Sequence, residues 1–401
     1  MQNPNDVVIT GIGLLSSLGE GADAHWEAFS GFTKPVIDTD RFAPYTVHPL
    51  TEVDWSQQIA KRGDQRQMEA WQRTGTYAAG LALADAGMKD DAALCGSMDM
   101  IVSAGGGERD ADVDTMILSR ADEGAADLEL LVNETLTTEL RPTLFLAQLS
   151  NLLAGNISIV HKVTGSSRTF MGEEGASIAA LQTAAARIRA GQSTHALVGG
   201  AYNSEHPDML LGYELGQHLH RDPWSPVWQR GSAEGGGIVT GSGSAFLVLE
   251  SRAHAEARNA RIYASLGVVA ADQAGTESAG TIARLNRLAD ETGLAEADMI
   301  VSAASGGDAR TADERQFLTE AFPQIPVRGI VTATGHLREA LVSFAVAVAA
   351  LSLYRNQILP ALDPTFESEA ADAPRKIGVV ALGFANSEGI AMLSANEGDK
   401  A

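Results

Sequence analysis

The chain alternates short apolar runs with segments in which apolar residues recur every three or four positions. Short apolar runs bounded by glycine predict buried strands, and the longer periodic segments predict amphipathic helices. From residue 174 to residue 190, apolar side chains at Ile178, Leu181, Ala185 and Ile188 share one helical face. This alternation predicts an α/β fold. The predicted strands include residues 7–13, 98–104, 196–198 and 245–249, and the predicted helices include residues 71–86, 174–190 and 340–354.

Two segments occur twice in the same order. The hexapeptide Asp-Met-Ile-Val-Ser-Ala stands at residues 99–104 and again at 298–303, each time leading into glycines. The tripeptide Asn-Ser-Glu follows a predicted strand at residues 203–205 and again at 386–388. Repeats in a shared context indicate a duplicated unit. We therefore expect two halves, residues 1–250 and residues 251–401.

Charge and composition restrict the classes of function. The formal net charge is −22, which argues against nucleic acid as a partner because phosphate binding needs a basic face. The acidity serves solubility, or it fits a basic partner subunit. A single cysteine, Cys95, excludes internal disulfides and cysteine-based metal clusters. The chain has no apolar run long enough to span a membrane and no signal peptide, so we expect a cytoplasmic protein.

One strand–turn–helix corner is the main candidate for chemistry. Residues 167–171 predict a strand, residues 172–175 a sharp turn, and an amphipathic helix follows. Such a corner directs turn residues and the first helical N–H groups into a pocket, so Glu173 and Glu174 are candidate site residues. The alternative is that both acids simply begin a helix, where acids are common.

Histidines and glycines add little to this candidate site. His336 follows Gly335 ahead of the predicted helix 340–354, and either lines the pocket or packs without a role. The other histidines show no metal-ligand spacing, and we expect no metal site. The glycines at residues 11–13 and 105–107 lack the remaining residues of nucleotide-binding loops, and no Gly-x-Ser-x-Gly motif occurs.

Several segments, taken in order, resemble the β-ketoacyl-acyl-carrier-protein synthases of the ketosynthase II type. They are residues 8–19, 65–71, 148–155 and 243–250, and the loop Gly383-Phe384-Ala385-Asn386. The resemblance implies a thiolase-like fold of two duplicated βαβαβαββ halves in a five-layer αβαβα arrangement. Within it, residues 65–71 resemble an early helix that faces the carrier protein, and residues 148–155 resemble a dimer-facing helix. No cofactor is implied.

The resemblance also implies site residues. In the family a cysteine at the corner accepts the acyl chain, and two histidines and a lysine support decarboxylation. Counting from Gly165 and back from Gly191 places Glu174 at the cysteine position, with Glu173 as the alternative. Ala304 falls at the first histidine, Val331 at the lysine, His336 at the second histidine, and Phe384 at the gating phenylalanine.

These replacements imply that the chain does not condense acyl groups by itself. A carboxylate is a much poorer nucleophile than a thiolate, and Cys95 precedes a strand far from the corner in the family fold. The resemblance extends to chain-length factors, which carry glutamine at the cysteine position. It extends also to the paired ketosynthase-like proteins with which alphaproteobacteria make very-long-chain acyl groups for lipid A.

Three functional hypotheses follow. The chain is a non-condensing partner of an active ketosynthase, a malonyl-carrier-protein decarboxylase that uses Glu174 and His336, or a binding scaffold with an occluded pocket. All three involve acyl carrier protein as a partner. The cluster Lys61, Arg62 and Arg66 is a candidate docking patch for it, or an ordinary solvated helix start.

Overall fold

The computed structural model describes residues 3–31, 34–124, 126–142, 144–230, 236–273, 280–370, 372–385 and 387–396, without the side chains of residues 146 and 147. The predicted α/β fold is confirmed. Ten main strands fall into two sets of five with the same order and the same directions. The first set runs β5 (Ser167–Phe170), β4 (Asp99–Ser103), β6 (His195–Tyr202), β8 (Gly243–Ser251), β1 (Val7–Ser16). The second runs β11 (Val327–Gly329), β10 (Met299–Ser302), β12 (Lys376–Leu382), β13 (Ser387–Ser394), β9 (Ala264–Gln273).

The two sets join into one sheet. β1 pairs with β9 in antiparallel fashion, with Val7 opposite Leu266 and Ile9 opposite Ala264. The repeated hexapeptide accounts for β4 and β10, which occupy equivalent places in the two sets. Of the second repeat, Asn386 lies outside the described residues. The described residues also form three minor strands: β2 (Gly19–Glu20), β3 (Val47–His48) and β7 (Thr240–Gly241).

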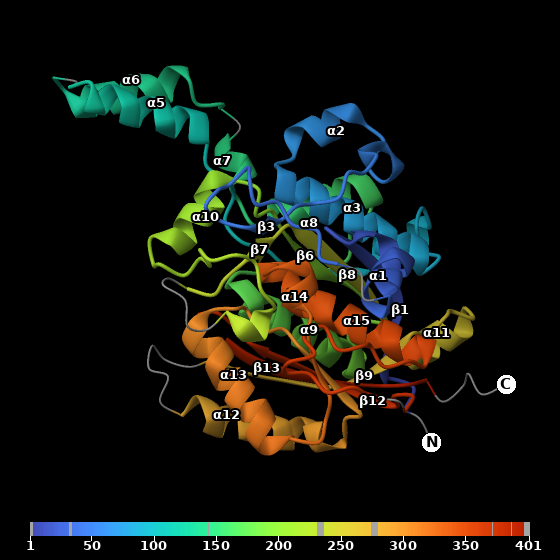
Figure 1. The fold of residues 1–401 in the computed structure, drawn as a ribbon. Coiled ribbons are helices and arrows are strands. Elements are labelled where there is room, and N and C mark those ends of the chain that lie inside the picture. Colours follow the sequence, from blue (N-terminus) through green and yellow to red (C-terminus); the bar gives the residue numbers. More distant parts are fainter. Residues whose placement is uncertain are drawn as a thin grey trace.

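Helices form three layers around the strands (Figure 1). α3 (Ala70–Asp85) and α8 (Leu152–His161) cover the first set, and α12 (Thr281–Thr292) and α13 (Asp308–Ala321) cover the second. α9 (Glu173–Arg189) and α15 (Leu341–Arg355) lie between the sets and contact strands of both. Thirteen consecutive residues of α15, from Leu341 to Leu353, are buried, as expected for a central helix. No helix among the described residues is long and apolar enough to cross a membrane.

The glycines near the N-terminus have a packing role. A Cβ at Gly11 would stand 2.4 Å from the carbonyl oxygen of Ala82, and one at Gly13 would stand 2.0 Å from that of Ala78. Both contacts are shorter than any side chain tolerates, so β1 and α3 approach this closely only with glycine. Gly11 and Gly13, whose spacing matches part of a dinucleotide-binding fingerprint, therefore allow β1 and α3 to pack closely.

Two predicted helices differ from the structure. Residues 65–71 span a break, because Met68 is extended and Glu69 caps α3 in a reciprocal arrangement with Gln72. In the segment 148–155, the helix α8 starts only at Leu152. The other helices are α1 (Gly21–Ser30), α2 (Arg62–Gln67), α4 (Ala92–Ser97), α5 (Ala111–Asp122), α6 (Leu128–Thr138), α7 (Leu144–Ala147), α10 (Pro207–Glu214), α11 (Arg252–Ala257) and α14 (Val331–Thr334).

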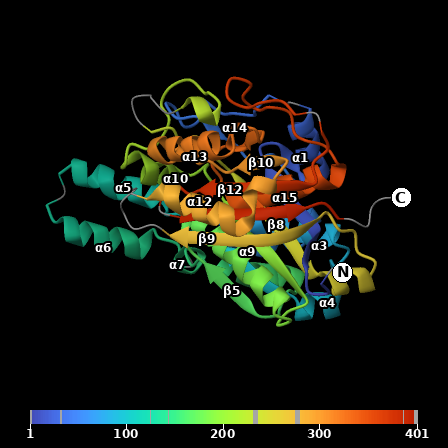
Figure 2. The ribbon, with the colours of Figure 1, turned by 90° about the horizontal axis from the view of Figure 1, so that it is seen from below.

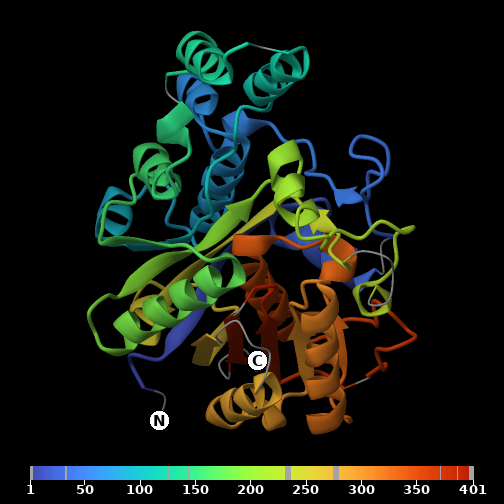
Figure 3. The same cartoon turned by 90° about the vertical axis from the view of Figure 1, so that its left-hand side faces the viewer.

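α5 and α6 pack against each other and stand away from the remaining elements (Figures 1, 2 and 3). Their exposed surface carries large apolar side chains: Leu118, Leu128, Leu130 and Leu136. The two helices form a helical hairpin. Contiguous exposed apolar side chains commonly mark an interaction surface.

Candidate functional site

The corner at the start of α9 is strained. β5 ends at Phe170, and Gly172 and Glu173 follow with φ values of 126° and 54° before α9 continues. A positive φ at a residue other than glycine is uncommon and occurs often at functional sites. The predicted strand–turn–helix corner is therefore present, with the helix beginning at Glu173.

Glu174 and His336 form a pair inside the protein. Both side chains have 0% exposure, and Nε2 of His336 lies 2.5 Å from Oε1 of Glu174. The backbone N–H of Phe384 donates to the same oxygen at 3.2 Å. Burial alone would raise the pKa of Glu174. The His336 ring and these hydrogen bonds overcome that effect and hold the pKa below its usual value.

The backbone fixes His336 in this position. Its N–H donates to the carbonyl of Val239, and its carbonyl accepts from Gly241. Its Nδ1 lies 3.3 Å from the hydroxyl of Tyr213. Both ring nitrogens are therefore engaged by protein groups, one by a carboxylate and one by a phenol.

Glu173 points elsewhere. Its Oε1 accepts from Arg338 at 2.9 Å, and the Arg338 guanidinium also lies over the rings of Tyr202 and Tyr213. Burial and the neighbouring Glu174 carboxylate raise the pKa of Glu173. Of the two corner acids, Glu174 is the one that the fold brings to His336.

The remaining predicted positions near the corner carry no acid–base group. Ala304 follows β10 and Val331 begins α14, and both side chains are fully buried in the main apolar core. Phe384 is half-buried, with its ring edge-on to those of Tyr213 and His218 at 5.3 and 4.7 Å. Arg338, Tyr213 and His218 were missed as site residues, because no local pattern links them to the corner.

A cavity of about 750 Å³ lies on the outer side of Glu173. Met171, Glu173, Arg338 and Glu339 are among the residues that line it, whereas Glu174 and His336 do not. The buried pair therefore does not line this cavity. Arg338, which does, makes a second ionic contact, 3.7 Å from Glu339.

Cys95 and the basic cluster lie away from the corner. Cys95 is buried in α4 within a second apolar cluster, and its Sγ donates to the carbonyl of Met88. Lys61, Arg62 and Arg66 are exposed at α2. Within the described part of the chain, no cluster of His, Cys, Asp and Glu is suited to hold a metal ion.

Glu314 of α13 is a second buried acid, close enough to Glu174 for the two carboxyl groups to interact electrostatically. It accepts from the hydroxyl of Ser302 and from the backbone N–H of Leu382 at 2.9 Å. Burial outweighs these bonds and raises its pKa to about 7. No signal in the sequence pointed to Glu314, because its partners come from two distant strands.

Glu314 should make folding stability depend on pH. Its folded pKa lies above the usual 4.5, so its contribution is fully present below that pH and is lost as the pH rises through 7. We expect the difference in unfolding free energy between wild type and Glu314→Gln to change by about 2.5 kcal/mol between about pH 5 and about pH 8. Urea denaturation at the two pH values measures it. A constant difference would show that Glu314 ionises normally.

Comparison with known proteins places this chain in a family. A family model described as the N-terminal domain of beta-ketoacyl synthase matches residues 4–255, more than half of the chain. The chain belongs to the beta-ketoacyl synthase family. Cys95, the single cysteine of this family member, lies outside the corner.

Relatives of this beta-ketoacyl synthase homologue align along nearly its whole length. It is 24% identical to a 3-oxoacyl-[acyl-carrier-protein] synthase 2 of Vibrio harveyi over 378 residues, covering 88% of this chain and 87% of that protein. It is 28% identical to the tetracenomycin polyketide synthase ketoacyl synthase beta subunit of Streptomyces glaucescens, again over 378 residues, covering 90% and 88%.

Solved structures confirm the thiolase-like ketosynthase fold. A chain of the ishigamide ketosynthase/chain length factor matches with a TM-score of 0.77 and 22% identity, covering 98% of this chain and 99% of that one. A chain from a type II polyketide acyl carrier protein in complex with its ketosynthase matches with a TM-score of 0.76 and 18% identity, covering 98% and 100%.

Proposed function

We propose that this ketosynthase homologue is a non-condensing partner subunit, similar to a chain-length factor, of an active β-ketoacyl-acyl-carrier-protein synthase. The observation that carries the proposal is the carboxylate of Glu174, buried against His336 at the start of α9. Condensation needs a soft, activated nucleophile. Removing one acid–base group costs about 10²–10⁴-fold, and removing several coupled groups leaves little beyond binding.

The names of the relatives support a subunit role. One relative is called a ketoacyl synthase beta subunit, and one similar structure is a ketosynthase/chain length factor. For this chain we propose fatty acid synthesis as the setting, with very-long-chain acyl groups of the lipid A type as the product. That finer assignment rests on the resemblance of the whole sequence.

The surface offers room for a partner. β5 is the outermost strand of its set, and no strand among the described residues pairs with its outer edge. Near its end Met171 is 64% exposed, and Phe145 in α7 is also 64% exposed. An open strand edge and exposed apolar side chains together favour a protein contact over bulk water.

Co-expression with an active ketosynthase tests the partner role. We expect the two chains to copurify and to elute together on a sizing column, and a Met171→Glu variant to weaken the complex. Leu215→Glu is a matched control, because Leu215 is 79% exposed and follows α10. Condensation of acyl and malonyl carrier proteins by this chain alone would refute the proposal.

Carrier-protein docking is expected at α2. Reversing Lys61, Arg62 and Arg66 to glutamate should weaken binding of acyl carrier protein by about tenfold or more, because each exposed ion pair contributes about 0.2–1 kcal/mol. Fluorescence anisotropy with a labelled carrier protein measures the change. The charge-matched control compares the double reversal Arg287→Glu/Arg315→Glu, on the opposite outer layer, with the double reversal Lys61→Glu/Arg66→Glu. If the α2 variant and the control variant bind acyl carrier protein with equal affinity, α2 is not part of the docking surface.

The contacts of His336 argue against the decarboxylase hypothesis. An enolate oxygen would need free donors, but Oε1 of Glu174 already occupies both His336 Nε2 and the Phe384 N–H. We therefore expect no carbon dioxide release from malonyl carrier protein above that of a Glu174→Ala variant. Release of carbon dioxide by the wild type and not by the Glu174→Ala variant would support the decarboxylase hypothesis.

A further inference from the structure

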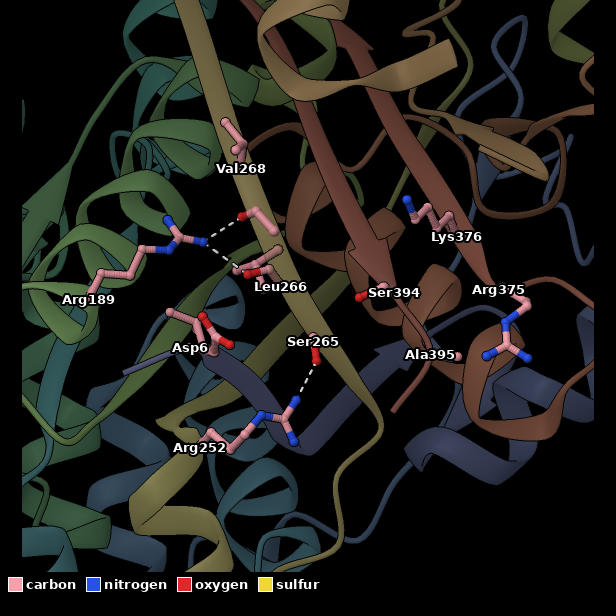
Figure 4. Close-up of a pocket in the computed structure, with 12 residues that line it drawn as sticks. Asp6, Arg189, Arg252, Ser265, Leu266, Val268, Arg375, Lys376, Ser394 and Ala395 are labelled. Carbon is pink, nitrogen blue, oxygen red and sulfur yellow. Dashed lines mark hydrogen bonds between the residues drawn. The ribbon is translucent and has the colours of Figure 1, made fainter. Parts of the chain in front are cut away.

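A second cavity lies at the far end of α9. It has a volume of about 590 Å³ and is bounded by the start of β1, the end of α9, the start of α11, and strands β9, β12 and β13 (Figure 4). Glu174 and Arg189 lie fifteen residues apart on one helix, which corresponds to about 22 Å at 1.5 Å per residue. The cavity is therefore separate from the corner.

Cations gather around this cavity although the chain is strongly acidic. Among the described residues, its lining includes Arg189, Arg252, Arg375 and Lys376 and a single acid, Asp6, in a chain of net charge −22. Lys376 is paired with Glu296, and Arg252 lies 3.6 Å from Glu256. Within the described ranges, neither Arg189 nor Arg375 forms an ion pair.

Arg252 is held in place with donor capacity to spare. The residue is only 5% exposed, and its guanidinium donates to Ser265 at 2.7 Å and to Asn396 at 3.1 Å. Its Nε is buried and has no hydrogen-bond partner among the described residues. A buried guanidinium N–H without an acceptor is costly, so an anionic ligand would relieve it.

Arg189 is also held in place. One of its terminal nitrogens donates to the carbonyls of Leu266 and Gly267, at 2.9 and 2.6 Å. The guanidinium therefore lies along β9 at the cavity wall, as Figure 4 shows. Arg375, on the opposite side, is exposed. Its backbone N–H donates to the carboxylate of Asp298 at 2.7 Å, and its guanidinium forms no ion pair with a described residue. The three arginines together present forked donors of the kind that binds phosphate oxygens in pairs.

We propose that this cavity binds a small phosphate-bearing molecule, of the size of a nucleoside diphosphate. The volume lies within the usual range for ligand sites, about 300–1,000 Å³. The charged groups supply the phosphate contacts, and Val7, Leu266 and Val268 supply an apolar wall for the rest of the ligand.

Calorimetric titration of the full chain with ADP, inorganic pyrophosphate and adenosine tests the site. We expect both phosphate compounds to bind and adenosine not to bind. Tighter binding of ADP than of pyrophosphate would show that the apolar wall contributes, and equal affinity would show that phosphate alone is recognised. Raising the salt concentration should weaken both.

Arginine variants test whether ADP binds in this cavity. Arg375→Ala is expected to weaken ADP binding by about tenfold or more without lowering the melting temperature, because Arg375 is exposed. Arg189→Ala should also weaken it, whereas Arg287→Ala on α12 should not. The proposal fails if neither phosphate compound binds, if adenosine binds as tightly as ADP, or if both cavity variants bind ADP like wild type.

Discussion

Replacing Glu174 with cysteine is expected to leave the chain unable to condense acyl and malonyl carrier proteins. The new thiol would stand beside His336, but Ala304 and Val331 would still supply no acid–base group for decarboxylation. Each missing group costs about 10²–10⁴-fold, so two leave a rate several orders of magnitude below that of an active enzyme. Radiolabelled malonyl carrier protein and separation of the acyl products measure the rate.

The control for this experiment adds the missing histidine and lysine to the Glu174→Cys variant. Glu174→Cys combined with Ala304→His and Val331→Lys should be more active than Glu174→Cys alone if the three positions are assigned correctly. Alkylation with iodoacetamide reports separately whether the new thiol is accessible. Substantial condensation by the single variant would show that other residues perform the acid–base steps.

Removing His336 is expected to destabilise the fold strongly. His336→Ala leaves Glu174 buried with 0% exposure and without its main partner. Breaking a buried pair in this way typically costs about 3–5 kcal/mol. Urea denaturation at neutral pH measures the loss, with Glu174→Gln as the control that keeps the shape and removes the charge.

The pH dependence of the unfolding free energy distinguishes this loss of a charge partner from the loss of packing that the missing ring alone would cause. In wild type the Glu174 pKa is lowered, so its stabilising contribution is present above its unfolded value and disappears as the pH falls through the folded value. Without His336, only backbone hydrogen bonds oppose the effect of burial on Glu174. Its pKa then rises, so the destabilisation should grow as the pH increases. A cost that is the same at every pH, or a Glu174→Gln/His336→Ala double variant as unstable as His336→Ala, would refute the charge argument.

Local pattern and family resemblance predict different parts of this structure. Periodicity and glycine boundaries are local, so they identified β1, α3, α9 and α15 to within a few residues. Counting between glycines, with the corner length that the resemblance implies, led to Glu174 as the residue at the cysteine position, and that assignment stays a prediction. The structure shows that Glu174 contacts His336. The break between α2 and α3 escaped prediction, since it depends on the backbone of Met68 and the capping by Glu69.

The charged surroundings of the corner could not be read from the sequence. Arg338 reaches Glu173 across 165 positions, and Tyr213 reaches His336 across 123. Such contacts are created by the packing of distant segments, so no spacing rule signals them. The same applies to the second cavity, whose arginines come from α9, from α11 and from the residue just before β12.

The pairing of β1 with β9 limits how this protein can be divided. Those two strands are the inner margins of their five-stranded sets, and each hydrogen-bonds to the other across the middle of the molecule. Cleavage in the connection after α11 would give fragments that each expose an unpaired strand and one side of the central helices. Such fragments would associate with each other or aggregate. Because the two five-stranded sets share this strand pairing, we expect that neither can be exchanged on its own for the corresponding set of a relative.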